Sequence, residues 1–153
     1  MSVWDLPNLR TVLTQNIPVT GAMGLTVRRV DDDGLVLGIP LAPNVNHKHT
    51  FFAGSLNAVA TLAGWSMLWT VLREAEVGAH VVIQDSTVHY LVPAQSDVTA
   101  EAKRSEPEAL ERALAQLARR GRARVALDAE VRDAEGRSVA TLRGRYVIHR
   151  RDE

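Results

Sequence analysis

The stretch that decides the fold is Thr50–Leu72, TFFAGSLNAVATLAGWSMLWTVL, which contains no charged side chain. Gly54 and Ser55 provide a start and Arg73-Glu74 an end, so we expect a helix over about Ser55–Arg73. It is apolar on nearly every side, and such a helix must be buried. A membrane span is the alternative for an uncharged run of this length. Four polar residues interrupt the run, namely Asn57, Thr61, Ser66 and Thr70. We therefore favour the core helix of a globular domain.

The segment before this helix predicts a short helix and a hairpin. Asp5 followed by Pro7 is typical of a helix start, with the aspartate as cap. Apolar residues at helical spacing then predict a helix over about Pro7–Asn16. Alternating apolar residues from Met23 to Leu41 surround the turn Asp31–Gly34, which predicts a β-hairpin.

The second half of the chain is rich in predicted strands. His80–Val92 and Asp97–Lys103 are followed by a helix that starts at Ser105-Glu106-Pro107-Glu108 and ends at Gly121. Two alternating strands then flank a turn at Asp133–Gly136. One all-round apolar helix and about six mostly antiparallel strands predict an α+β fold. A curved antiparallel sheet wraps around the long central helix and covers every face of it. This is the hotdog architecture, as a single domain over residues 1–153.

Composition narrows the function classes. The 153 residues suit one domain, and 18 Lys+Arg balance 18 Asp+Glu. We expect neither a nucleic-acid partner nor a membrane partner, because anionic surfaces attract a net cationic protein. The chain has no cysteine, which excludes disulfides, thiol nucleophiles and thiolate metal sites. We expect no metal site at the five histidines, which lack carboxylate partners at ligand spacing. The first 20 residues lack the order of a secretory signal, so we expect a cytoplasmic protein.

The polar segment Asn44–Ser55 leads directly into the buried helix and is the strongest candidate site. The first turn of a helix has unpaired N–H groups that favour a carbonyl oxygen or an oxyanion. Gly54 would let a substrate carbonyl approach this backbone closely. The structural alternative is that the asparagines only shape the loop and that Ser55 only caps the helix.

From Asn46 to Thr61 the sequence resembles acyl-thioesterases of the hotdog superfamily. Asn46 matches the Asn of the phenylacetate-pathway branch, and Phe52-Ala53-Gly54 stands where that branch has His-Gly-Gly. The closer resemblance, over about residues 5–149, is to the thioesterase domain at the C-terminus of YiiD-type acetyltransferases. Five segments carry it: Asn46-His47-Lys48, Gly54-Ser55-Leu56, Ala60–Trp65, Tyr90–Pro93 and Arg119–Arg124.

The resemblance implies hydrolysis of an acyl-CoA or an acyl-carrier-protein thioester, with coenzyme A as part of the substrate and no further cofactor. The thioester carbonyl would lie against the N–H group of Gly54 at the helix start, next to Ser55, which is a further candidate residue of the site. Asn46 would orient this carbonyl or the attacking water. Thr61 occupies the position where the branch has a catalytic carboxylate. No carboxylate occurs between Val45 and Arg73, so the usual mechanism does not transfer intact.

Several residues could replace the missing carboxylate. The imidazoles of His47 and His49 can exchange protons near neutral pH, although loop histidines are often bystanders. Asp85 lies in the predicted central strand and could reach the helix start of a second subunit, or it could simply face outward. We hypothesise a water activated by Asp85 or His47.

A second set of candidate residues could bind the phosphates of coenzyme A. Arg120, Arg122 and Arg124 belong to the only strong basic run, and arginine forks suit phosphates. The same run also suits a solvent-exposed helix C-terminus. Trp65 and Trp69 either line an acyl tunnel or belong to the core.

Three functions compete: an acyl-thioester hydrolase, a non-catalytic acyl-binding module of the same fold, and a hydratase or dehydratase. The third ranks last because Pro40-Leu41-Ala42-Pro43 lacks a neighbouring His-Phe-Pro pattern. The resemblance also implies a homodimer or a dimer of dimers, paired through the long central strands.

Overall fold

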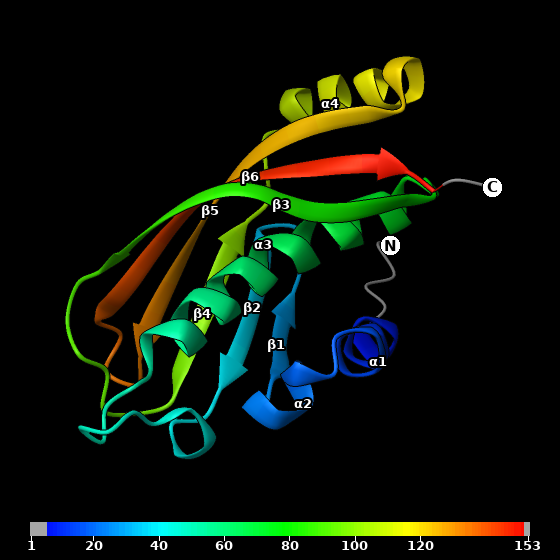
Figure 1. Cartoon of the computed structure of the whole chain (residues 1–153). Coiled ribbons are helices and arrows are strands. Elements are labelled where there is room, and N and C mark those ends of the chain that lie inside the picture. Colours follow the sequence, from blue (N-terminus) through cyan, green and yellow to red (C-terminus); the bar gives the residue numbers. More distant parts are fainter. Residues whose placement is uncertain (1–5, 152–153) are drawn as a thin grey trace.

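The computed structural model describes residues 6–151, which form six strands and five helical segments. In chain order the elements are α1 (Leu6–Asn16), α2 (Val19–Met23), β1 (Thr26–Val30), β2 (Gly34–Ile39), the 3-10 turn η1 (Ala42–Asn44), α3 (Ala53–Glu74), β3 (Ala79–Tyr90), β4 (Val98–Lys103), α4 (Pro107–Arg120), β5 (Arg122–Asp133) and β6 (Ser138–Arg150). The strands form one antiparallel sheet in the order β1-β2-β4-β5-β6-β3. This sheet curves around α3, which confirms the predicted α+β hotdog architecture (Figure 1).

α3 is the core helix that the uncharged stretch predicts. It packs against β2, β3, β4, β5 and β6 on the concave face of the sheet. It is long and apolar enough to cross a membrane by composition, but 67% of its most apolar 18-residue window is buried inside the protein. Burial in the core therefore accounts for its composition.

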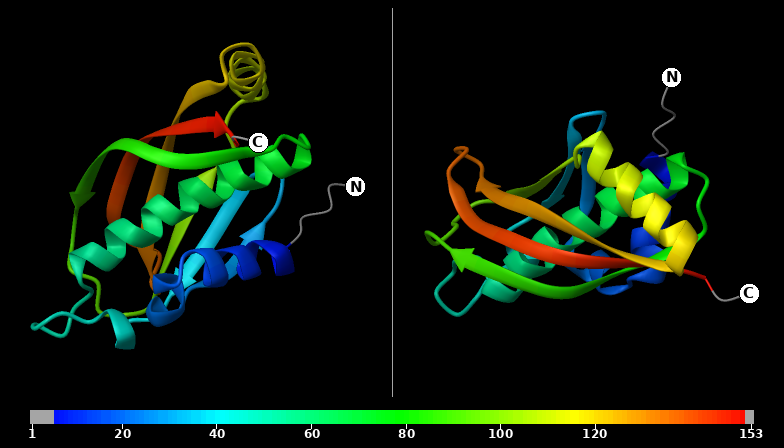
Figure 2. Two further views of the ribbon diagram at one scale, coloured as in Figure 1. Left: turned by 45° about the vertical axis from the view of Figure 1, so that its right-hand side comes forward. Right: turned by 90° about the horizontal axis from the view of Figure 1, so that it is seen from above.

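The sheet does not cover every face of α3, which corrects the sequence-based expectation. Asn57, Thr61, Trp65 and Trp69 follow one another at four-residue spacing and are only half-buried, whereas their neighbours Val59, Ala63 and Met67 are fully buried. We call these four residues the open stripe. The open stripe exists because the strands curve around one side of α3 and leave its opposite side free of strands (Figure 2).

The two strands that flank the turn at Asp133–Gly136 alternate between buried and more exposed residues, as the sequence predicts. The alternating buried residues are Ala123, Val125, Leu127, Ala129 and Val131 in β5, and Ala140, Leu142, Gly144, Tyr146 and Ile148 in β6. They face α3, and the charged residues between them lie on the convex face.

β4 is shorter than β5, so it leaves part of the β5 edge uncovered. β4 pairs only with residues 129–133 of β5. α4 packs against β5. β1 and β3 are the two edge strands of the sheet, and β3 pairs only with β6 among the described residues.

Three boundaries that the structure describes differ from the sequence-based prediction, and a fourth is untested. Met23 ends the short helix α2 instead of starting a strand, because Gly24 in the left-handed conformation (φ 71°) terminates that helix. The second hairpin strand ends at Ile39, before Leu41. Glu106, rather than Ser105, is the N-cap of α4, without a side-chain hydrogen bond. The predicted cap Asp5 lies outside the described residues.

Candidate functional site

α3 begins without a side-chain cap. Phe52 is the N-cap residue and has extended backbone angles (φ −63°, ψ 128°). Ser55 lies inside the first turn, so it does not cap the helix, and the N–H groups of Ser55 and Leu56 donate to the Phe52 carbonyl (3.0 and 3.2 Å). The N–H groups of Ala53 and Gly54 have no partner among residues 6–151. Two hydrogen-bond donors thus remain free at the positive end of the helix dipole.

The first turn of α3 is open to solvent. Phe52, Ala53 and Gly54 are all exposed, and Ser55 is half-buried. The ring of Phe52 folds back onto Gly54, where an added Cβ would lie 2.4 Å from Phe52 Cε1. The space that glycine leaves on this side is therefore filled by Phe52, and the free N–H groups are reached from the end of the helix.

Asn46 organises the loop before α3. Its Oδ1 accepts hydrogen bonds from the N–H groups of Lys48 (2.9 Å) and Thr50 (3.1 Å). Its Nδ2 donates to Thr50 Oγ1 (2.9 Å) and to the Phe51 carbonyl (3.3 Å). All four contacts lie within one loop, so the observed task of Asn46 is to shape the chain that leads into the helix. A catalytic role for it stays a prediction.

His47 and His49 lie at the exposed tip of this loop, which the bridge between Val45 and Phe51 closes. His49 adopts a left-handed backbone (φ 62°). No group of three or more His, Asp or Glu side chains in the described part of the chain is arranged to hold a metal.

A hydrogen-bonded chain runs from β6 to the N-terminal half of the open stripe. The Tyr146 hydroxyl donates to the Thr61 carbonyl (2.7 Å), and Thr61 Oγ1 donates to Asn57 Oδ1 (3.2 Å). Burial raises the pKa of the Tyr146 phenol, which therefore stays a neutral donor. In the sequence, Asn57 only interrupts an apolar helix, and no local pattern singles out Tyr146. Their meeting depends on the tertiary structure.

The C-terminal half of the open stripe is aromatic. The rings of Trp65 and Trp69 stack at a centroid distance of 6.5 Å, and the Arg73 guanidinium lies 5.1 Å from the Trp69 ring centre. Trp65 Nε1 donates to the Val81 carbonyl of β3 (2.9 Å). The stripe thus changes from polar near the helix start to aromatic further along.

Asp85 lies on the opposite side of the sheet from α3. A β-bulge between Ile83 and Asp85 shifts the register, so that Asp85 pairs with Arg145. Arg145 is exposed between buried Gly144 and Tyr146, and residues directly opposite each other share a face. Asp85 therefore lies on the convex face, away from the start of α3 in its own protomer.

The basic run also lies far from Gly54 within one protomer. Arg120 is in the last turn of α4, and Arg122 and Arg124 are exposed on β5. Arg122 pairs with His149, which pairs with His80 near the C-terminal end of α3. Since α3 has 22 residues, its ends are about 33 Å apart. Arg124 also donates to Gln84 Oε1 (3.2 Å).

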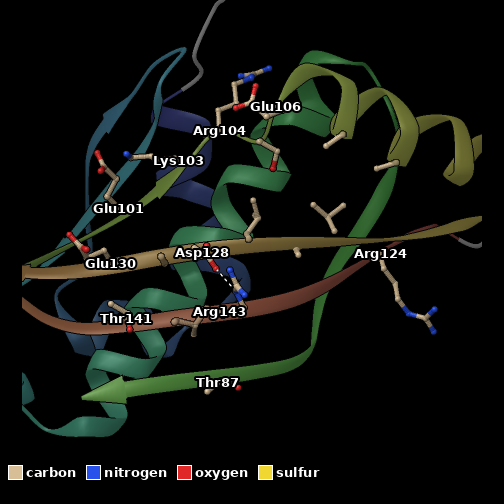
Figure 3. A pocket seen from close by; sticks show the side chains of 18 of the residues that line it. Thr87, Glu101, Lys103, Arg104, Glu106, Arg124, Asp128, Glu130, Thr141 and Arg143 are labelled. Carbon is tan, nitrogen blue, oxygen red and sulfur yellow. Dashed lines mark hydrogen bonds and ion pairs between the residues drawn. The ribbon is translucent and has the colours of Figure 1, made fainter. Parts of the chain in front are cut away.

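A groove of about 1240 Å³ lies on the convex side, between α4 and the sheet (Figure 3). Charged residues of both signs line it, including the ion pair between Arg143 and Asp128 (3.1 Å). Its walls come from α4, β3, β4, β5 and β6 and include no residue of α3. It is thus separate from the helix start.

Comparison with known proteins identifies a family and several structures that share this fold. Residues 6–150 match the family described as "Putative thioesterase (yiiD_Cterm)". A protein of unknown function from Chlorobaculum tepidum superposes with a TM-score of 0.90 at 27% identity, covering 95% of this chain and 94% of that one. A "putative thioesterase" from Shewanella oneidensis has a TM-score of 0.84 at 29% identity, covering 95% and 97%. The Escherichia coli PaaI protein of the phenylacetic acid degradation operon shares the fold, with a TM-score of 0.69 at 19% identity over 99% and 94%. The chain therefore belongs to the YiiD C-terminal thioesterase family of the hotdog superfamily.

Proposed function

We propose that the protein hydrolyses acyl thioesters at the start of α3. The observation that carries the proposal is the pair of unpartnered N–H groups of Ala53 and Gly54, in a chain of a thioesterase family. Donors fixed in this way stabilise the negative charge that develops on a carbonyl oxygen under attack.

In the proposed reaction, water oxygen attacks the thioester carbon while the carbonyl electron pair moves onto oxygen, where the Gly54 N–H holds it. The carbonyl then reforms, the C–S bond breaks, and the thiolate leaves with the proton lost by water. The products are a carboxylic acid and a thiol. The apolar acyl group would lie along the open stripe, toward Trp65.

His47 is the proposed proton acceptor. Of the two acceptors suggested by the sequence, it belongs to the loop that leads into α3, whereas Asp85 lies on the convex face. In a dimer that continues the sheet through β3, Asp85 would still face away from both core helices. The assignment therefore rests on His47→Ala lowering kcat while Asp85→Asn leaves it unchanged. The reverse result would move the role to Asp85.

We propose that a second copy of the chain encloses the site. β3 offers its outer edge, and apolar side chains are exposed at and just beyond its end, including Tyr90 (50%), Leu91 (52%) and Val92 (41%), as well as Phe52 (54%). The Phe51 N–H donates to the Ala94 carbonyl (2.9 Å), which ties this end of β3 to the start of α3. Antiparallel pairing of two β3 strands would cover these side chains. Two such dimers would form a dimer of dimers.

The same pairing gives the basic run a function. It would bring Arg122 of a second copy beside the Tyr90 end of β3, and thus toward the start of α3. Arginine at this place suits the phosphates of coenzyme A, or of the phosphopantetheine of a carrier protein.

The decisive experiment measures release of free thiol from acyl-CoAs of short, medium, long and aromatic acyl groups, and from the matching acyl-carrier-protein conjugates. Turnover with any of them is the expected result. The competing function is an acyl-binding module, which the absence of a carboxylate between Val45 and Arg73 favours. Saturable binding without thiol release would establish the module instead.

A further inference from the structure

We propose that Asn57 is a catalytic residue, whose side-chain amide supplies a hydrogen-bond donor to the thioester carbonyl in addition to the backbone N–H groups at the start of α3. This inference rests on the proposed function and adds a named group to it. Neither the composition of α3 nor the resemblance of the sequence assigns a task to this residue.

Asn57 lies one turn beyond Gly54 on the same side of α3. Three residues correspond to a rise of about 4.5 Å, and residues three or four apart are neighbours on a helix surface. Side chains of a helix lean toward its N-terminus, so the Asn57 amide extends toward the first turn. Half-burial leaves it accessible at the open stripe.

The hydrogen-bond chain fixes which end of the amide is free. Thr61 Oγ1 donates to Asn57 Oδ1 (3.2 Å), so the two N–H groups on Nδ2 face away from Thr61. The side chain of Asn57 makes no other hydrogen bond among the described residues. Thr61 is in turn part of a rigid segment, since its carbonyl accepts the Tyr146 hydroxyl (2.7 Å). Two oriented donors thus remain on Asn57, about one helical turn from the free N–H of Gly54.

These donors suit the oxygen that gains charge when water attacks a thioester. The Gly54 N–H and one Asn57 N–H would hold this oxygen from two directions while the carbonyl electron pair resides on it. Neither donor accepts a proton, so the amide acts only by stabilising charge. In this arrangement Thr61 is a positioning residue, because its hydroxyl orients the amide.

Asn57→Asp separates this role from a structural one. The aspartate keeps an oxygen that accepts the Thr61 hydroxyl but loses both N–H donors. We expect kcat for thiol release from the best acyl-CoA to fall about 100-fold, the loss typical of one oxyanion donor, with little change in KM. Thr61→Val should lower kcat less, since the amide remains but is no longer oriented. Gln116→Glu makes the same amide-to-acid change on α4 and should leave kcat unchanged. Thermal unfolding of each variant verifies the fold.

The outcomes are distinct. If the wild-type protein turns over and folded Asn57→Asp retains or exceeds its kcat, Asn57 is not a donor and the inference is overturned while the proposed function stands. If the wild-type protein releases no thiol from any substrate, the proposed function fails and the inference fails with it.

Discussion

The Tyr146 hydroxyl donates a 2.7 Å hydrogen bond to the backbone carbonyl of Thr61, and it does so across the face of Gly64. A Cβ on Gly64 would lie 2.3 Å from the Tyr146 hydroxyl oxygen. The absence of a side chain at position 64 thus allows β6 to contact α3 this closely. The contact fixes the half of α3 that carries Asn57 and Thr61.

Gly64→Ala should therefore destabilise the protein, although alanine favours helices. The clash with a fully buried ring outweighs the gain in helix propensity, and overpacking of a core costs about 1–3 kcal/mol. Chemical denaturation measures this loss. Ala58→Gly, at a half-buried position of the same helix, provides a control for helix propensity alone. An unchanged or increased free energy of unfolding for Gly64→Ala would show that Tyr146 is free to move aside.

Tyr146→Phe should cost about 1 kcal/mol of unfolding free energy, the usual net value of one hydrogen bond. In the Gly64→Ala background the same change should cost less or even stabilise, since the clashing oxygen is gone. Denaturation of the two single variants and the double variant measures the coupling. Strict additivity would contradict the proposed contact.

Thr61→Asp should introduce a base at the position where the phenylacetate-pathway branch, which the sequence resembles, has a catalytic carboxylate. Thr61 is half-buried on the open stripe, so the carboxylate remains partly hydrated. We expect kcat/KM to rise at least about tenfold, since a positioned general base contributes 10²–10⁴-fold. The rate should fall at acidic pH as the new carboxylate becomes protonated. Thr61→Asn is the control without charge and should show neither effect. Thr61→Val lacks both the base and the hydroxyl that orients Asn57, so folded Thr61→Asp that is no faster than Thr61→Val would argue against a reacting carbonyl beside this part of α3.

Asp133 should make stability depend on pH at the acidic end. Burial opposes ionisation of its carboxylate, but the N–H groups of Glu135 and Arg137 (both 3.0 Å) and Arg137 Nε (2.8 Å) outweigh that effect and lower the pKa of Asp133. A lowered pKa stabilises the fold above the ordinary aspartate value of about 3.9, and this contribution is lost as the pH falls toward the lowered value. Asp133→Asn should reduce Tm at pH 7 and flatten the fall of Tm between pH 5 and 2. An unchanged pH dependence would show that other carboxylates govern acid unfolding.

The proposed dimer predicts a mass near 34 kDa by light scattering, twice the 16.8 kDa of one chain. Tyr90→Lys should raise the dissociation constant at least tenfold, because it places a charge in the apolar end of β3. Gln95→Lys adds the same charge at an exposed position outside the strand and should leave the dimer intact. A monomer at micromolar concentration for the wild-type protein would contradict this proposal.

The sequence was sufficient for the architecture because the long elements have strong local signals, either an uncharged stretch or a regular alternation. The uncharged stretch predicted α3 to within two residues of its start, and the alternation in β5 and β6 predicted which side chains face it. The errors occurred where a single local feature overrides the pattern. Gly24 ends a helix where Met23 was expected to start a strand. The half-buried face of α3 has a different cause, because it depends on how far the whole sheet curls around the helix.

The candidate site divides in the same way. From the sequence alone, Gly54 could be placed at the start of a buried helix, and the absence of a carboxylate between Val45 and Arg73 was evident. The position of a helix and the charges that it carries both follow from the composition of one continuous segment. Only the tertiary structure decided that Asp85 lies on the convex face, that the arginine run is distant from Gly54, and that Tyr146 and Thr61 orient Asn57. These facts depend on strand register, on a single bulge and on contacts between residues up to 85 positions apart, and no local pattern encodes them.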